Sequence, residues 1–114
     1  MKTSVVKKKS FLGTRSKEEF ILEVKKILSD NVVEAYVFGS FFSEKFNADS
    51  DFDLLLIVDT NKEFLKRPLL FSELDTLKAP IDLIVYTPSE FEKIKKEEKV
   101  GFWKSIFSEM VQII

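Results

Sequence analysis

Apolar residues recur along the chain at two spacings, one typical of helices and one typical of strands. The first helical pattern follows Ser16-Lys17-Glu18-Glu19, which has the form of a capping box. One face of this predicted helix carries Phe20, Ile21, Val24, Ile27 and Leu28. The pattern predicts an amphipathic helix over residues 17–29, which Asp30 and Asn31 end.

Three apolar runs predict strands, at Val32–Phe38, Phe52–Val58 and Ile81–Tyr86. The second run is apolar on both faces, as the central strand of a sheet is. A short linker joins the first two runs, which predicts an antiparallel pair. The stretch 59–80 is long enough for a helical crossover, which lets the second and third strands run parallel.

The remaining segments predict helices around this sheet. Residues 41–46 are expected to form a short helix before a turn at 47–50, with Phe42 and Phe46 one turn apart. A helical stretch after Asn61 has Pro68 near the start of its main part and ends at Pro80. Its inward residues are expected to be Leu69, Leu70, Leu74 and Leu77.

The carboxyl-terminal third predicts two more helices. A second capping box, Thr87-Pro88-Ser89-Glu90, opens a helix to about Glu98. One face of a last predicted helix carries Phe102, Trp103, Ile106, Phe107 and Met110. Residues 111–114 are expected to form a short extended edge. We therefore expect an α/β (α+β) fold, a small mixed sheet of three to four strands with flanking helices, in one domain spanning residues 1–114.

Composition narrows the possible functions. Lys and Arg number 18 against 19 Asp and Glu, so charge gives no argument for a nucleic acid or a membrane partner, and nucleic acid is expected at most as an acceptor. Cysteine and histidine are both absent, so catalysis would need carboxylates, hydroxyls, Lys or Arg. The longest aliphatic run, Leu54–Val58, is far shorter than a membrane span of ~20 residues. We expect a cytoplasmic protein with a flexible basic segment at residues 1–15, in which Lys7–Lys9 form a solvated charge run.

Acidic residues open two of the predicted strands. Asp51 and Asp53 share one face of the second strand, and Asp82 is the second residue of the third. Because parallel strands start at the same edge, the three carboxylates should converge near Gly39-Ser40. Unpaired carboxylates beside an apolar sheet are costly, so a cation is expected there, and an oxygen-only ligand set favours Mg²⁺.

Each signal also has a simpler interpretation. A Gly-Ser pair is usually a turn, and acids in polar loops often act as caps. The conjunction favours a site: a strand, Gly-Ser, ten residues, Asp-Phe-Asp opening a central strand, and another acid opening an apolar strand. The twelve phenylalanines are mostly expected in the core, with a partner surface as the alternative for Phe41, Phe42, Phe46, Phe102, Trp103 and Phe107.

These residues resemble the minimal nucleotidyltransferases of the polymerase-beta superfamily, through Gly39-Ser40, Asp51-Phe52-Asp53 and Asp82. The resemblance implies the polymerase-beta-like fold and two Mg²⁺ ions held by the three acids. It further implies that Gly39 and Ser40 contact a nucleoside triphosphate, with ATP the expected donor of AMP to a hydroxyl. Lys45 is expected to contact the nucleotide as well, as a nearby cation. Small members of this kind are often antitoxins paired with a HEPN-domain protein, whose tyrosine is then the expected acceptor.

One departure from the family pattern supports an alternative function. The family often continues after Gly-Ser with Ala-Arg-Gly, whereas this chain has Phe41-Phe42-Ser43-Glu44-Lys45. Glu44 is unfavourable beside a triphosphate unless Lys45 compensates. The alternative is a binding module with a weak or silent nucleotide site, which neutralises its partner by forming a complex. A chain this short also needs a partner or a homo-oligomer to select the acceptor.

Overall fold

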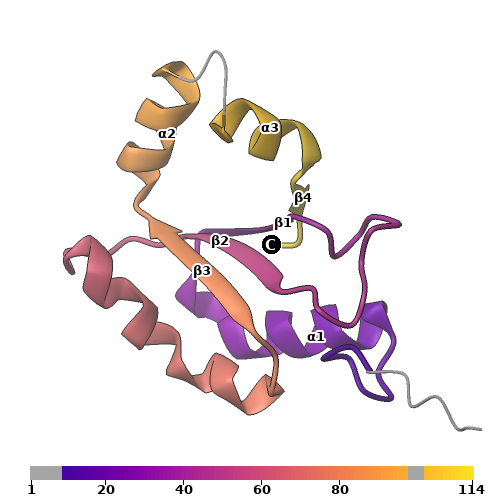
Figure 1. Cartoon of the computed structure of the whole chain (residues 1–114). Helices are drawn as coiled ribbons and strands as arrows, with labels where there is room; N and C mark the ends of the chain where they lie inside the picture. The colour runs from indigo at the N-terminus through magenta and orange to yellow at the C-terminus, as the bar shows by residue number, and fades with distance from the viewer. Residues whose placement is uncertain (1–8, 98–101) are drawn as a thin grey trace, which may run out of the picture.

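The fold centres on a four-stranded mixed sheet with the order β3-β2-β1-β4 (Figure 1). The computed structural model describes residues 9–97 and 102–114. The strands are β1 (Glu34–Phe38), β2 (Phe52–Ile57), β3 (Ile81–Tyr86) and β4 (Val111–Gln112). β1 is antiparallel to β2 and β4, whereas β2 and β3 are parallel. The expected mixed sheet and its strand directions are confirmed.

Helical segments cover both faces of this sheet. One face carries α1 (Lys17–Leu28) and the 3-10 segment η2 (Phe64–Leu77), and the other carries α2 (Pro88–Glu97) and α3 (Phe102–Glu109) (Figure 1). A short 3-10 turn, η1 (Ser29–Asn31), follows α1. The capping box of α1 is present in both directions, since Ser16 Oγ accepts from Glu19 N and Glu19 Oε1 accepts from Ser16 N.

Two hydrophobic cores lie on opposite sides of the sheet, because successive side chains of a strand point to opposite faces. The larger core, under α1 and η2, includes Phe20, Val24, Leu28, Phe52, Leu54 and Leu56. The smaller core, under α2 and α3, consists of Tyr36, Leu55, Ile57 and Phe91, with Phe38, Trp103 and Phe107 packed against it. By the same alternation, Asp53 and Asp82 lie on the face that α2 and α3 partly cover.

The segment at residues 41–46 forms consecutive turns, so the prediction of a short helix there is wrong. Ser43 explains the difference, because its hydroxyl donates to Ser40 O and accepts from Lys45 N. Such side-chain bonds offer the backbone an alternative to helical bonds. The side chain of Phe41 is fully buried, as expected of a core residue.

The inward face of η2 differs from the prediction. Leu69 and Leu70 are exposed, at 75% and 47%, whereas Leu74 and Leu77 are buried as predicted. Arg67 and Phe71 take the other inward positions. The reason is that η2 has 3-10 turns and a non-helical residue at Phe71, which shift the phase of the apolar face.

Arg67 is a buried cation that joins three elements. Its guanidinium donates to Lys62 O, to Val85 O at the end of β3, and to both carboxylate oxygens of Glu90 in α2. The hydrogen bond from Arg67 is the main cause that lowers the pKa of Glu90. Arg67 therefore fixes η2 and the start of α2 against the sheet.

Replacing Arg67 by methionine is expected to lower the free energy of unfolding by about 2 kcal/mol, because Val85 O and Lys62 O lose their donor. Urea unfolding followed by circular dichroism measures the change. Lys66→Met is the matched control, since the Lys66–Glu63 ion pair is largely exposed and should contribute under about 1 kcal/mol. Equal unfolding midpoints for the two variants would contradict this role of Arg67.

The amino-terminal segment is partly described. Residues 1–8, with Lys7 and Lys8, lie outside the described residues, as do Glu98 and Lys99. From residue 11 onward the chain contacts the core: the ring of Phe11 lies 5.1 Å from that of Phe20 and 5.5 Å from that of Phe46, centroid to centroid. Within residues 9–97 and 102–114, every helix is too short or too polar to cross a bilayer.

Candidate active site

The register of the sheet places two acids side by side. Asp53 lies opposite Asp82 in the parallel pair β2–β3, and opposite Phe38 in the antiparallel pair β1–β2. All three side chains share one face, and Gly39 follows Phe38 directly. As predicted, β2 and β3 start at the same edge of the sheet, and Asp53 lies between Phe38 and Asp82 there.

Asp53 bears the electrostatic consequence of this arrangement. Burial raises the pKa of its carboxyl group to about 6, and the adjacent Asp82, by charge repulsion and a side-chain hydrogen bond, adds to the rise, with a smaller contribution from Asp51. These effects favour the protonated form of Asp53 over its charged form. The pair therefore favours any ligand that brings positive charge.

Asp51 stands apart from this pair. It is exposed and immediately precedes β2, and its negative charge contributes to the raised pKa of Asp53. Across the described ranges 9–97 and 102–114, no three acidic side chains lie close enough to hold a metal ion. The structure therefore brings Asp53 and Asp82 together and leaves Asp51 beside them.

Both the backbone conformation at position 39 and the neighbouring Asp53 side chain favour glycine there. Its φ of +73° is one that residues with a side chain rarely adopt. A Cβ atom at this position would overlap the Oδ2 atom of Asp53. The backbone of Gly39 thus lies directly against the Asp53 carboxylate.

A hydroxyl pair connects the Gly-Ser turn to the acidic strand. Ser40 Oγ donates to Ser50 Oγ over 3.1 Å, and Asn47 N donates to the same oxygen over 2.9 Å. Asn47 Oδ1 in turn accepts from Asp49 N, which closes an Asx turn. The loop between Gly39 and Asp51 is therefore held at both ends by its own polar side chains.

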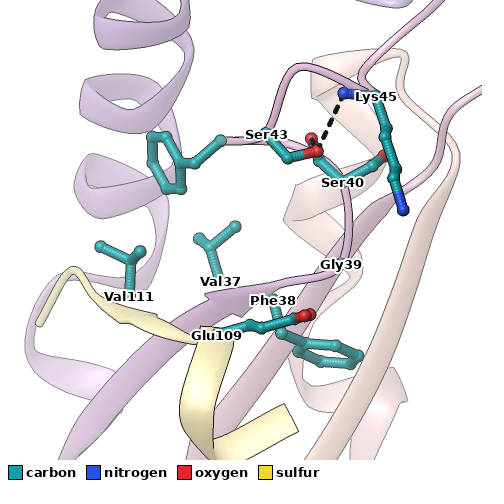
Figure 2. Close-up of a pocket in the computed structure, with 9 residues that line it drawn as sticks. Val37, Phe38, Gly39, Ser40, Ser43, Lys45, Glu109 and Val111 are labelled. Atoms are coloured by element: carbon teal, nitrogen blue, oxygen red, sulfur yellow. Dashed lines mark hydrogen bonds between the residues drawn. The ribbon is translucent and has the colours of Figure 1, made fainter. Parts of the chain in front are cut away.

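A cavity of about 480 Å³ opens beside the Gly-Ser turn. Figure 2 shows Ser40, Ser43 and Lys45 on its loop wall, and the carboxylate of Glu109 directed toward Gly39 from the end of α3. The cavity is lined by Val37, Phe38, Gly39, Ser40, Phe42, Ser43, Lys45, Glu109 and Val111. Three residues predicted to contact a nucleotide, Gly39, Ser40 and Lys45, therefore share one wall.

The acidic residue that lines the cavity beside Gly39-Ser40 is Glu109, not Glu44. Glu44 is exposed and does not line the 480 Å³ cavity, whereas Lys45 does. Glu109 was not predicted as a site residue, because only the pairing of β4 with β1 brings the end of α3 to this place. The expected extended edge at residues 111–114 was the one signal in the sequence that pointed there.

A second cavity, of about 410 Å³, lies over the acids. It is lined by Phe38, Asp53, Asp82, Leu83 and Ile84. Phe38 lines both cavities and so stands between the Lys45 side and the Asp82 side. This arrangement provides two adjoining spaces, one beside backbone and hydroxyl groups and one beside carboxylates.

The donor set of this site fits a hard divalent cation and a phosphate chain. Carboxylate oxygens are the ligands that Mg²⁺ prefers, and burial together with the neighbouring Asp82 raises the pKa of Asp53. The cavity at Gly39-Ser40 has no side chain on its glycine and carries the Lys45 cation and two hydroxyls. The site is therefore suited to a metal-bound nucleoside triphosphate.

Comparison with known families agrees with the fold. A family model described as polymerase beta, nucleotidyltransferase, matches residues 22–108. A search of curated proteins finds no match.

Some solved structures with a similar fold come from toxin–antitoxin complexes. One chain from a toxin–antitoxin with AMP-PNP aligns with a TM-score of 0.58 and 18% identity, over 82% of this chain and 72% of that one. Another belongs to a tri-AMPylated Shewanella oneidensis HEPN toxin in complex with its MNT antitoxin, with a TM-score of 0.55 and 17% identity over 87% and 72% of the two chains. At these identities the likeness establishes the fold.

Proposed function

Since this chain belongs to the polymerase beta nucleotidyltransferase family, we propose that it transfers AMP from ATP to a hydroxyl group. The observation that carries the proposal is the contact between three parts of the site: Asp82 pairs with Asp53, and Asp53 lies against the backbone of Gly39. The phosphate-contacting turn and the acids are thereby adjacent.

The acids have separate tasks in the proposed reaction. Asp51, Asp53 and Asp82 would hold two Mg²⁺ ions. When bound, the ions would supply positive charge at the attacking oxygen and at the departing pyrophosphate. The carboxylate of Asp82, which lines the 410 Å³ cavity, accepts the proton of the acceptor hydroxyl.

The other side of the site positions the donor. The Gly39 and Ser40 backbone, with the Lys45 ammonium group, contacts the triphosphate in the 480 Å³ cavity. The acceptor oxygen forms a bond to the α-phosphorus as the bond to pyrophosphate breaks. Alignment of these two bonds supplies much of the acceleration.

A HEPN toxin is the proposed partner, and one of its tyrosines the proposed acceptor. The support is that a similar fold occurs in the antitoxin-containing complex of an AMPylated HEPN toxin. By this proposal the chain is an antitoxin that inactivates its toxin by covalent modification.

Incubation with α-labelled ATP, Mg²⁺ and a HEPN-domain protein tests the proposal. Labelled HEPN protein is expected with the wild-type chain, and at least 10³-fold less with Asp51→Ala plus Asp53→Ala. Transfer by the double variant at the wild-type rate would refute the assignment.

A second function, a binding module with a silent site, is favoured by one observation. The Glu109 carboxylate faces the same cavity as Lys45 and opposes its charge, which weakens attraction for a triphosphate (Figure 2). This function predicts that the double variant still neutralises the partner. Loss of neutralisation while the complex still forms would exclude it.

A further inference from the structure

The outer edge of β3 is open beside the acids. β3 is the first strand of the sheet order, so no described strand pairs with its outer edge. Pro80 O and Tyr86 O accept bonds from β2, at Phe52 N and Val58 N, so even-numbered residues of β3 face β2. Ile81, Leu83 and Val85 therefore direct their backbone groups outward.

Arg67 limits this open edge to its first half. Its NH1 group donates to Val85 O, which occupies the outward acceptor at the far end of β3. No described residue hydrogen-bonds to the outward backbone groups of Ile81 or Leu83. The backbone groups that are open to another strand thus belong to Ile81 and Leu83, the two neighbours of Asp82 in the chain.

Cavities flank this edge on both faces of the sheet. A groove of about 250 Å³ lies between the edge and η2, and its walls include Leu69, Phe71, Leu74, Ile81 and Leu83. The 410 Å³ cavity over Asp53 and Asp82 lies on the other face. Leu83 lines both, so the edge is the boundary between an apolar groove and the candidate active site.

We propose that an extended segment of the acceptor protein pairs with the Ile81–Leu83 edge as an added strand. Its successive side chains then alternate between the two cavities. A tyrosine directed to the acidic face reaches the Asp53–Asp82 pair, while an adjacent apolar side chain fills the groove beside Leu69. The proposal rests on the proposed function and specifies how the acceptor is chosen.

The charges around this edge define the acceptor further. Charged residues lining the two cavities are Asp75 in the groove and Asp53 and Asp82 in the site, and no basic residue among 9–97 and 102–114 lines either. An acidic segment would be repelled there. The segment that fits carries tyrosine next to an aliphatic residue, with basic residues around them.

A matched pair of variants tests the groove. Leu69→Glu alters a groove-lining side chain that is 75% exposed, and Leu65→Glu alters one that is 87% exposed on the same segment and does not line the groove. The probe is the capped peptide Lys-Val-Tyr-Val-Lys with labelled ATP and Mg²⁺. Leu69→Glu is expected to lower kcat/KM for the peptide at least 10-fold with an unchanged KM for ATP, and Leu65→Glu to lower it less than 2-fold. Equal effects of the two variants would overturn the proposal.

Two modified peptides test the backbone pairing. One carries an N-methyl group on the tyrosine nitrogen and the other on the nitrogen of the following valine. Because alternate residues of a strand direct their N–H groups to opposite sides, one of the two peptides should lose acceptor activity and the other should keep it. Equal activity of both peptides would contradict strand addition.

The outcomes separate this proposal from the proposed function. Labelling of the unmodified peptide that is insensitive to Leu69→Glu and to N-methylation would remove the edge as the acceptor site and leave nucleotidyl transfer intact. Absence of labelling on both the peptide and the HEPN protein would remove the proposed function, and with it the inference.

Discussion

Replacing Gly39 by alanine is expected to lower nucleotidyl transfer at least 10³-fold. The new methyl group would overlap Asp53 Oδ2, so the carboxylate at the centre of the site must move. The positive φ of Gly39 adds a backbone cost of about 1–2 kcal/mol. Transfer of labelled AMP to the HEPN protein measures the first effect, and urea unfolding the second.

Gly13→Ala is the matched control for this variant. Gly13 has a φ of +63°, and a Cβ atom there would have nothing within 4 Å. It should therefore show the backbone cost alone, with transfer within about 2-fold of the wild-type rate. If both variants retained transfer, the contact between Gly39 and Asp53 would have no role in catalysis.

Asp53→Asn should stabilise the metal-free protein at pH 7.5 while abolishing transfer. The pKa of Asp53 is raised to about 6 from an ordinary value of 3.8, so the native state holds an extra proton between these values. Stability contributed by this group is complete below about pH 4, falls as the pH rises through 6, and stays low above it. Asparagine carries no charge, so the variant avoids this loss, which is on the order of 1 kcal/mol for a partly exposed group.

Thermal unfolding in EDTA from pH 4 to 8 measures this effect. The difference in Tm between Asp53→Asn and the wild-type protein should grow in favour of the variant as the pH rises from 4 to 6.5. Asp30→Asn, in the 3-10 turn after α1, is the control, since Asp30 is exposed and lines neither cavity. A Tm difference between Asp53→Asn and the wild-type protein that does not change with pH would contradict the raised pKa of Asp53.

Local signals in the sequence predicted most of the fold. The capping box at Ser16 fixed the start of α1, and the alternation around Asp82 fixed which of its neighbours shared its face. The lengths of the linkers predicted the strand directions, because an antiparallel pair needs few connecting residues and a parallel pair needs many. These features depend on residues near one another in the chain.

The errors arose where local side-chain bonds, a backbone break or tertiary contacts override the hydrophobic pattern. Ser43 hydroxyl bonds replaced a helix at residues 41–46, and the break at Phe71 turned Leu69 and Leu70 outward. Glu109 reaches the site only because β4 pairs with β1, which brings together residues that lie far apart in the sequence. Asp51 shares the strand periodicity of Asp53, but it precedes β2 and stays exposed.

The most direct test of the central claim is a calorimetric titration of Mg²⁺ with a non-hydrolysable ATP analogue into wild-type protein, Asp53→Asn and Asp82→Asn. If the two adjacent carboxylates hold the metal-bound nucleotide, the wild-type protein binds the analogue only with Mg²⁺ present, and each variant binds at least 10-fold more weakly. Equal, metal-independent binding by all three proteins would contradict the account.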